Sequence, residues 1–477
     1  MSAIAGIYEA DGKPVSEETL IQMREVATHR GSDGAGVWTR SSVGFAHNGQ
    51  PLTNGMGFWI TADCRIDNRA ELAVEFENMP GFHPDLPDCA YVLQAYVRWG
   101  EEAPSRLLGD FAFAVWDERK RQLFCARDPL GVKPFFYHWD NRRFLFGSEI
   151  KQIFQASGVP TDANLAHLAD LLLMNPPGQW ETPYAAVQKL PPGQFLRIRE
   201  GRLAMESYFE WKSEPGLSRR PSLEENARIF LGIFRQAVQD RLRTSSPHRA
   251  GSLLSGGLDS SSIVAVGAVS PPLPVFTLHF PEADLRYKLD WADWVNETPY
   301  VDRMIGAYPS LESHPVPILA EQFLHDLYDC LRAQEEPLPF PLLPCYQHLF
   351  RTASEAGAGF LLNGEGGDEL FLVSGKPLFQ LVSLLPRFLK VFLRKALGMD
   401  IPALIRPEFA DKISLSDRLE SSRKTSAGLE NSPYGILRPL RSGVLPAHLE
   451  AFDRIAASNG MEVRYPFLDL RLLRFSA

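Results

Sequence analysis

Cysteine is scarce in this chain, and the few cysteines show no pattern of pairing. The five residues are scattered, odd in number and without CxxC spacing: Cys64, Cys89, Cys125, Cys330 and Cys345. This argues against a disulfide framework and against a cysteine-based zinc site. We interpret them as structural thiols of a protein that works in a reducing compartment.

Clean apolar runs and an excess of basic charge are also missing. The most apolar long stretch, 378–399, contains a proline and four basic residues, too many for the roughly 20 apolar residues of a membrane span. We predict a basic amphipathic helix packed on its own domain, and the alternative is a face that docks a peptide, a partner protease or a membrane surface. The net charge of −9 offers no basic field for nucleic acid. No secretory signal pattern opens the chain, so a cytoplasmic protein is expected.

The length of 477 residues and the change of secondary-structure pattern along the chain predict two domains. Residues 1–155 carry short aromatic and β-branched runs between turn formers, such as GFWITADCRI and DFAFAVWD, which predict antiparallel sheets packed with two helices near 17–28 and 90–99. Residues 156–221 are rich in proline and glycine and are predicted to be an interdomain segment. Over 222–477 strands alternate with helices, which predicts a parallel α/β sheet.

The stretch SLLSGGLDSSSIVAVG, residues 252–267, has the features of a phosphate-binding loop. Two glycines after a short apolar strand let the backbone approach an anion, and hydroxyls and helix N-terminal amides supply donors. The candidate residues are Ser255, Gly256, Gly257, Asp259, Ser260 and Ser261. The stretch lacks the GK[ST] ending of a Walker loop, and Asp259 stands where a Mg²⁺ ion bridging phosphates would take a carboxylate.

A second string, FLLNGEGGDELF at 360–371, also follows an apolar strand. Its carboxylates, Glu365, Asp368 and Glu369, would repel one another unless a cation or a basic substrate group joined them. An acidic surface turn is the alternative interpretation of this string alone. Together with SGGLDSS, it favours a second part of the same site.

These two strings, with RDPLGVKPFFY upstream and ASNGMEVRYPFLDLRLL downstream, resemble the asparagine synthetase family. HRGSDGAG, LLGDFAFAVWD and FGSEIKQI extend the resemblance over nearly the whole chain. It implies an N-terminal four-layer αββα domain similar to class II glutaminases, and a C-terminal parallel-sheet domain similar to ATP pyrophosphatases. Such enzymes use ATP and Mg²⁺ to adenylate a carboxylate, and an amine then displaces AMP.

The resemblance also implies roles for individual residues. Asp259 and Asp368 match the Mg²⁺ carboxylates, and Glu365 matches the residue that takes a proton from the attacking amine. ATP and its pyrophosphate would be held by Leu253, Ser255, Gly256, Gly257, Asp259, Ser260, Ser261, Leu278, Asn363 and Gly364.

The N-terminal domain departs from the glutamine-hydrolysing pattern at several positions. Ser2 stands where those members carry an N-terminal cysteine, and a hydroxyl ionises far less readily than a thiol. The carboxylate clamp is shortened to AHNGQPL at 46–52. The NGE string aligns with Asp63, Cys64 and Arg65, and a carboxylate at Asp63 would repel an oxyanion. Asp88 does match the aspartate that contacts the glutamine amine, but we expect an inactive glutaminase.

The sequence also departs from the family pattern at its C-terminal end. Members of the family continue past PFLD for about a hundred residues and include a GxxKxxLR string, whereas this chain stops at FSA. The sequence is therefore expected to be a fragment or a catalytically incomplete enzyme.

Four functions stay open on the sequence. The leading prediction is macrolactam formation of the lasso-peptide type, in which a precursor side-chain carboxylate is adenylated and attacked by the peptide's own α-amine. Asparagine synthesis is the second, with ammonia from outside or from an active glutaminase. β-Lactam synthetases, which resemble this chain but have Tyr where Glu365 stands, are third. A non-catalytic binding protein built on the same fold is the last.

Overall fold

The computed structural model describes residues 2–31, 34–48, 52–53, 56–172, 178, 180–210, 222–244, 249–268, 272–281, 297–337, 340, 342–371, 406–415 and 443–476. The predicted basic helix at 378–399 lies outside the described residues. Within the described part of the chain, no helix combines the length and apolarity needed to cross a membrane.

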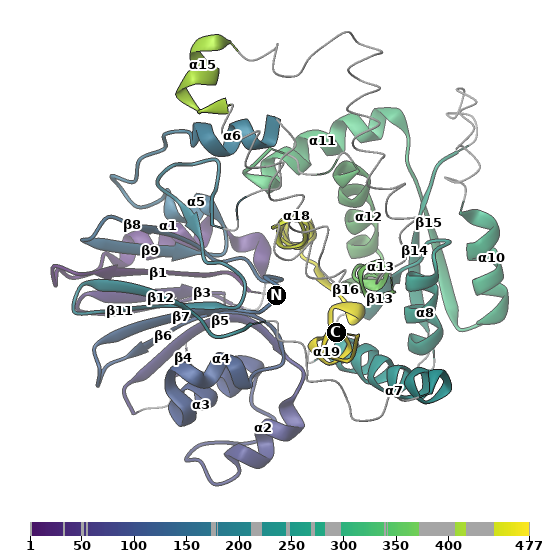
Figure 1. Ribbon diagram of the computed structural model, residues 1–477, viewed down its shortest axis with the longest axis horizontal. Helices are drawn as coiled ribbons and strands as arrows, with labels where there is room; N and C mark the ends of the chain where they lie inside the picture. Colours follow the sequence, from purple (N-terminus) through teal and green to yellow (C-terminus); the bar gives the residue numbers. More distant parts are fainter. Residues whose placement is uncertain are drawn as a thin grey trace.

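Two antiparallel sheets lie face to face in the N-terminal domain, on the left of Figure 1. The first has the order β10 (Gln188–Lys189), β8 (Phe136–Trp139), β9 (Arg143–Gly147), β1 (Ile4–Glu9), β3 (Val43–His47) and β2 (Gly36–Arg40). The second has the order β12 (Arg202–Ser207), β11 (Gln194–Arg199), β7 (Gln122–Arg127), β6 (Gly109–Asp117), β5 (Phe58–Ile66) and β4 (Leu52–Thr53). Buried side chains such as Phe45, Phe146 and Leu196 form one core between them.

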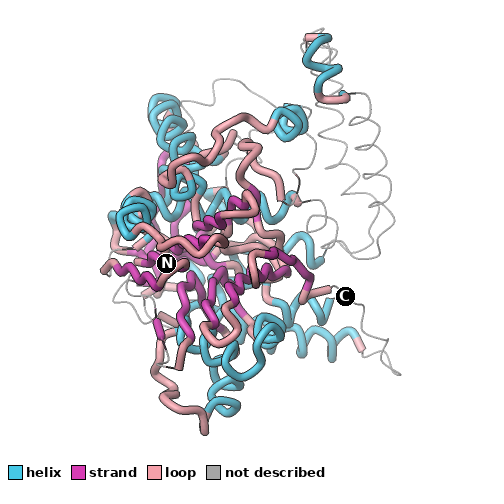
Figure 2. Tube along the Cα trace, turned by 90° about the vertical axis from the view of Figure 1, so that its left-hand side faces the viewer, coloured by secondary structure: helices cyan, strands magenta, loops and turns pink. Residues whose placement is uncertain are grey.

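Helices cover the outer faces of both sheets. α1 (Glu17–Glu25) and α5 (Ile150–Ile153) pack on the first sheet, and α2 (Arg69–Phe76), α3 (Asp88–Trp99) and α4 (Ala103–Arg106) lie on the second. The hydroxyl of Ser16 caps α1 by accepting the Thr19 backbone N–H at 3.2 Å. The predicted αββα architecture is therefore confirmed, and Figure 2 shows strands with helices above and below them.

The segment 156–221 supplies three strands of these sheets, β10, β11 and β12. β11 pairs with β7 over Phe195 to Arg199, and β12 forms the edge. This part of the chain is therefore more than a connection, because the second sheet is completed by it.

Alternation along β5 decides which of its side chains can take part in a site. Ile60, Ala62 and Ile66 point to the core beneath α2 and α3. Because the side-chain period of a strand is two, Asp63 and Arg65 point to the opposite face. This is the inner face toward the first sheet, where Thr61 contacts His47 of β3. Asp63 also lies 3.7 Å from the Nζ of Lys133, which binds Glu462 of the C-terminal domain.

The C-terminal domain contains a sheet of five parallel strands, as predicted. Its order is β15 (Leu311–Pro317), β14 (Leu273–His279), β13 (Arg249–Leu253), β16 (Ala358–Leu362) and β17 (Glu462–Arg464). Around it lie α7 (Leu223–Leu242), α8 (Leu258–Gly267), α10 (Thr298–Ala307), α11 (Ala320–Gln334), α12 (Leu343–Glu355), α18 (Val444–Ser458) and α19 (Leu470–Ser476). From β13 the chain adds β14 and β15 on one side of the sheet and then returns to the other side of β13 to add β16 and β17. The direction in which strands are added therefore reverses between β13 and β16. In open α/β sheets, ligands bind at the carboxyl ends of strands at such a switch point.

Candidate active site

The predicted phosphate loop leaves the carboxyl end of β13, at the switch point. The loop ends where α8 begins at Leu258, and Gly257 precedes the helix in an extended conformation. Its hydroxyls order the turn: the Ser260 Oγ lies 2.9 Å from the Ser255 Oγ and accepts the Ser255 backbone N–H at 3.0 Å. Leu253 and Leu278, at the ends of β13 and β14, pack against the domain core.

The second motif leaves the carboxyl end of β16 and packs directly on the first. A Cβ atom at Gly364 would lie 3.0 Å from the Ser260 backbone nitrogen, and one at Gly367 would collide with the Asp259 carboxylate. Gly366 has φ +98°, a conformation that glycine adopts without strain. The glycines of GEGGDE are therefore needed for this close approach as well as for the turn.

The two motifs bring carboxylates together at this edge. Partial burial raises the pKa of Asp259 to about 6, and the charges of Asp368 and Glu365 add to the rise. Asp368 lies in the short helix α13 (Gly367–Phe371), and its side chain is exposed. Carboxylate oxygens that repel one another beside a phosphate loop are the donor set that Mg²⁺ prefers. Asp259 and Asp368 therefore fit such an ion.

We expect binding of Mg²⁺ and ATP to weaken as the pH falls below about 6, because protonation of Asp259 removes a ligand charge. The loss should approach about tenfold per pH unit well below that value. Calorimetry with Mg²⁺ and α,β-methylene-ATP between pH 5 and pH 8 measures it. Asp259→Asn should bind weakly and keep only the shallower slope that protonation of the nucleotide's own terminal phosphate produces, and a slope as steep as that of the unaltered protein would contradict the assignment.

Glu365 follows β16 in the chain, and its carboxylate faces His448 of α18. The Asn363 Oδ1 accepts the Glu365 backbone N–H at 3.0 Å, and the Asn363 N–H donates to the Arg464 carbonyl at 2.9 Å. Across from this turn, the His448 Nδ1 lies 3.2 Å from the Glu365 Oε1. These contacts hold the base candidate beside the metal and phosphate candidates.

The N-terminal remnant site lies at the interdomain contact. Ser2 donates its backbone N–H to the Asp63 Oδ1 at 3.1 Å, and the Lys133 Nζ lies 3.7 Å from the same oxygen. Lys133 also bonds to the Glu462 Oε1 of β17 at 2.9 Å. Burial would lower the pKa of Lys133, but the charges of Asp63 and Glu462 raise it well above its usual range. The lysine is therefore a buried cation joining the two domains.

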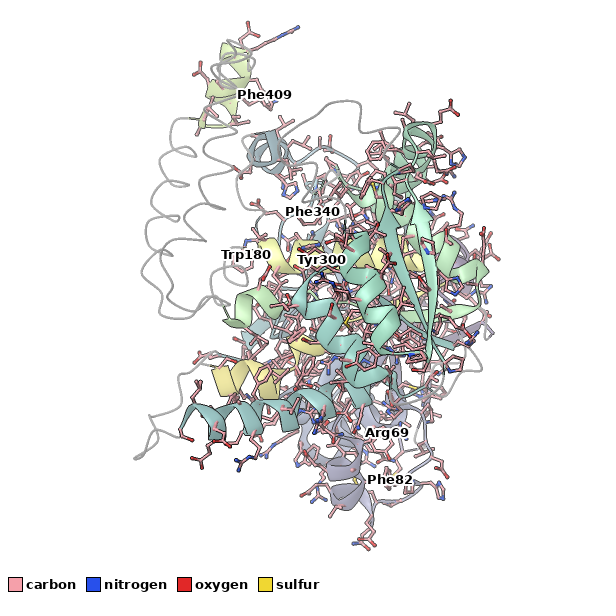
Figure 3. All side chains as sticks on the ribbon, turned by 90° about the vertical axis from the view of Figure 1, so that its right-hand side faces the viewer. Arg69, Phe82, Trp180, Tyr300, Phe340 and Phe409 are labelled. Atoms are coloured by element: carbon pink, nitrogen blue, oxygen red, sulfur yellow. The ribbon has the colours of Figure 1, made fainter. Side chains whose placement is uncertain are left out.

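Asp88 is occupied by groups of its own chain. Its carboxylate accepts the Ile66 N–H at 2.9 Å and an Arg243 Nη2 hydrogen bond at 3.1 Å, and it pairs with Arg69. Arg69 also lies over the Tyr91 ring, 4.2 Å from its centroid. Arg69 is labelled at the lower end of the molecule in Figure 3. A free amine would have to displace two guanidinium groups to reach Asp88.

Further buried ion pairs connect the domains. Arg127 donates to the Glu450 Oε1 at 2.7 Å and to three backbone carbonyls. Arg30 pairs with Glu149, and one of its nitrogens lies 2.6 Å from Asp453 of α18. Each of these side chains is almost completely buried, so the interface contains several buried ion pairs.

The sequence reasoning missed several of these residues. Lys133 stands in the quoted string RDPLGVKPFFY, and a lysine inside an otherwise apolar run was a usable signal. Arg69, Arg243 and His448 had no such signal, because each lies in an ordinary amphipathic or turn context. Their partners are remote in sequence, so only folding identifies them.

Comparison with known proteins decides the family. A model described as a glutamine amidotransferase domain matches residues 1–209, and one described as asparagine synthase matches residues 230–477. The chain belongs to the asparagine synthase family. As a member, it is a ligase that forms carbon–nitrogen bonds.

Individual relatives of this asparagine synthase family member are distant. Asparagine synthetase [glutamine-hydrolyzing] 3 of Bacillus subtilis is 26% identical over 100% of this chain and 80% of the relative. Asparagine synthetase [glutamine-hydrolyzing] 1 of the same organism is 29% identical over 74% of this chain and 55% of the relative. Amidase chry2 of Gibberella zeae is 27% identical over 76% of this chain and 56% of its own. Among solved structures, a glutamine phosphoribosylpyrophosphate amidotransferase from B. subtilis is 14% identical, with a TM-score of 0.33 over 58% of this chain and 74% of that chain.

Proposed function

We propose that this protein is an ATP-dependent amide ligase whose amine does not come from glutamine hydrolysed in its own N-terminal domain. The observation that carries the proposal is the occupied Asp88: the position expected to contact the amine of glutamine already pairs with Arg69 and Arg243. Ser2 in place of cysteine, with Asp63 bonded to its backbone N–H, supports the same conclusion. The N-terminal domain then serves as a structural partner of the ligase domain.

In the proposed reaction, a substrate carboxylate attacks the α-phosphorus of ATP, the bond to the β-phosphate breaks, and pyrophosphate leaves. The loop around Ser255, Gly256, Gly257 and Ser260 would hold the phosphates with backbone and hydroxyl donors. Mg²⁺ on Asp259 and Asp368, when bound, would offset phosphate charge. An amine then attacks the acyl carbon, Glu365 takes a proton from it, and AMP leaves.

For the substrate, we propose a peptide that supplies both groups, giving a macrolactam of the lasso type. A side-chain carboxylate and an α-amine on one bound chain react as an effectively unimolecular pair, which needs no ammonia source. A precursor peptide and a partner protease would then accompany the enzyme. Asparagine synthesis from external ammonia is the second candidate, favoured by the names of the B. subtilis relatives.

The test is exchange of pyrophosphate into ATP by the full reading frame with Mg²⁺. L-Aspartate and a precursor peptide from the same locus are compared, with Asp259→Ala as the control. Exchange that depends on the peptide and is lost in the variant would support the macrolactam proposal. Exchange with aspartate alone would replace it with asparagine synthesis. No exchange with either substrate would contradict ligase activity and favour a non-catalytic binding role.

Restoring the cysteine should not restore glutamine hydrolysis. In Ser2→Cys we expect glutamate release from glutamine to stay at the background of the unaltered protein, because Asp63 and Cys64 stand where the oxyanion donors would be and Asp88 stays occupied. A coupled glutamate assay measures this, and removal of Met1 is checked by mass spectrometry. Hydrolysis well above background in Ser2→Cys would show that the pocket still binds glutamine.

A further inference from the structure

His448 is the basic side chain found against the proposed general base. Its Nδ1 lies 3.2 Å from the Glu365 Oε1, within hydrogen-bond distance. Both side chains are about three-quarters buried, with exposed fractions of 23% for His448 and 24% for Glu365. Partial burial strengthens such a contact relative to one in open water.

Aromatic rings fix the orientation of the imidazole. The Phe340 ring centroid lies 4.1 Å from that of His448, and the Phe452 ring, one turn further along α18, lies at 4.8 Å. Tyr346 in turn packs on Phe452 at 4.7 Å. Phe340 is labelled in Figure 3, in the ligase domain. These two ring contacts restrict rotation of the imidazole, which presents its Nδ1 to Glu365.

Among the residues that the structure describes, the other titratable groups shown to sense the Glu365 charge are acidic or phenolic. They are Asp259, Tyr346 and Tyr465, whose pKa values are raised by burial first and by Glu365 in addition. These groups cannot become cations. His448 therefore provides a donor, and when protonated a positive charge, that none of these three can provide.

We propose that His448 is a positioning residue for amine attack: it holds the Glu365 carboxylate in the orientation that accepts the amine proton. The inference rests on the proposed ligase function and on the role of Glu365 there. Adenylation breaks the bond between the α- and β-phosphates and transfers no amine proton. His448 therefore acts on the second half-reaction and leaves the first unchanged.

The test separates the two half-reactions in three variants. His448→Leu removes the donor, whereas His448→Asn keeps an amide nitrogen close to the place of Nδ1. His325→Leu, an exposed histidine on α11, is the matched control. Each is assayed with L-aspartate or the precursor peptide, whichever supports exchange in the unaltered protein. The measurements are pyrophosphate exchange, amide product, and hydroxamate formed with hydroxylamine, an amine that is unprotonated at neutral pH.

In His448→Leu, we expect exchange and hydroxamate within about twofold of the unaltered protein, and amide formation lower by about ten- to a hundredfold in kcat with KM unchanged. His448→Asn should recover most of the lost rate of amide formation. The double variant His448→Leu with Glu365→Gln should form amide only slightly more slowly than Glu365→Gln alone. An equal fall of exchange and amide formation, or no fall in either, would overturn the role of His448. A lack of exchange in the unaltered protein would instead overturn the ligase proposal itself.

Discussion

Glu365→Gln is expected to lower amide formation by about 10²- to 10⁴-fold while pyrophosphate exchange stays close to that of the unaltered protein. The amide of glutamine fills the same space and can still contact His448, but it cannot accept the proton that the attacking amine must lose. The acyl-adenylate should therefore form, persist and be trapped by hydroxylamine. Single-turnover assays with labelled ATP measure formation of the adenylate and its transfer to the amine separately.

Glu355→Gln is the control for this experiment, because Glu355 is an exposed residue at the end of α12. It should behave as the unaltered protein in both half-reactions. A loss of exchange in Glu365→Gln equal to the loss of amide would place Glu365 with the nucleotide and metal groups. Full activity in Glu365→Gln would remove it from the reaction.

Lys133→Met should destabilise the folded protein by about 3 to 5 kcal/mol. Methionine replaces the length of the lysine but not its charge, and it leaves Asp63 and Glu462 buried at the domain contact without their shared cation. Bulk solvent does not reach this contact to compensate, since the Lys133 side chain is only 2% exposed. Urea unfolding followed by tryptophan fluorescence measures the shift in the midpoint.

Lys13→Met provides the matched comparison for that variant. Lys13 also pairs with a carboxylate, Asp11 at 2.8 Å, but its side chain is 66% exposed, so its loss should cost under about 1 kcal/mol. Adding Asp63→Asn to Lys133→Met should recover part of the stability, because the carboxylate left without the lysine is then absent, whereas Glu462 keeps its ion pair with Arg464. Equal effects of the two lysine variants would show that the buried contact is weaker than its geometry indicates.

Most of the fold was predicted from short local patterns in the sequence. The runs GFWITADCRI and DFAFAVWD became β5 and β6, and SLLSGGLDSSSIVAVG became the end of β13, the loop after it and α8. These succeeded because alternation, turn formers and helix starts act over a few residues. The strands β10 to β12 were not foreseen, since their surroundings are rich in proline and glycine and their pairing partners lie far back in the chain.

The sequence by itself determined the chemistry for which this protein is equipped. Its phosphate-loop and carboxylate motifs are contiguous strings, so each fixes its own turn and functional groups with neighbours only a few positions away. The departure at Ser2 could be read in the same way. No tertiary contact was needed to expect an altered glutaminase.

The tertiary structure alone decided which groups are already in use. Asp88 pairs with Arg69 and Arg243, which lie 19 and 155 positions away, and Lys133 joins Glu462 across 329 positions. The same holds for His448 beside Glu365. Ion pairs and ring contacts depend on separations of a few ångströms in space, and sequence distance does not report those separations until the sheets and helices have packed.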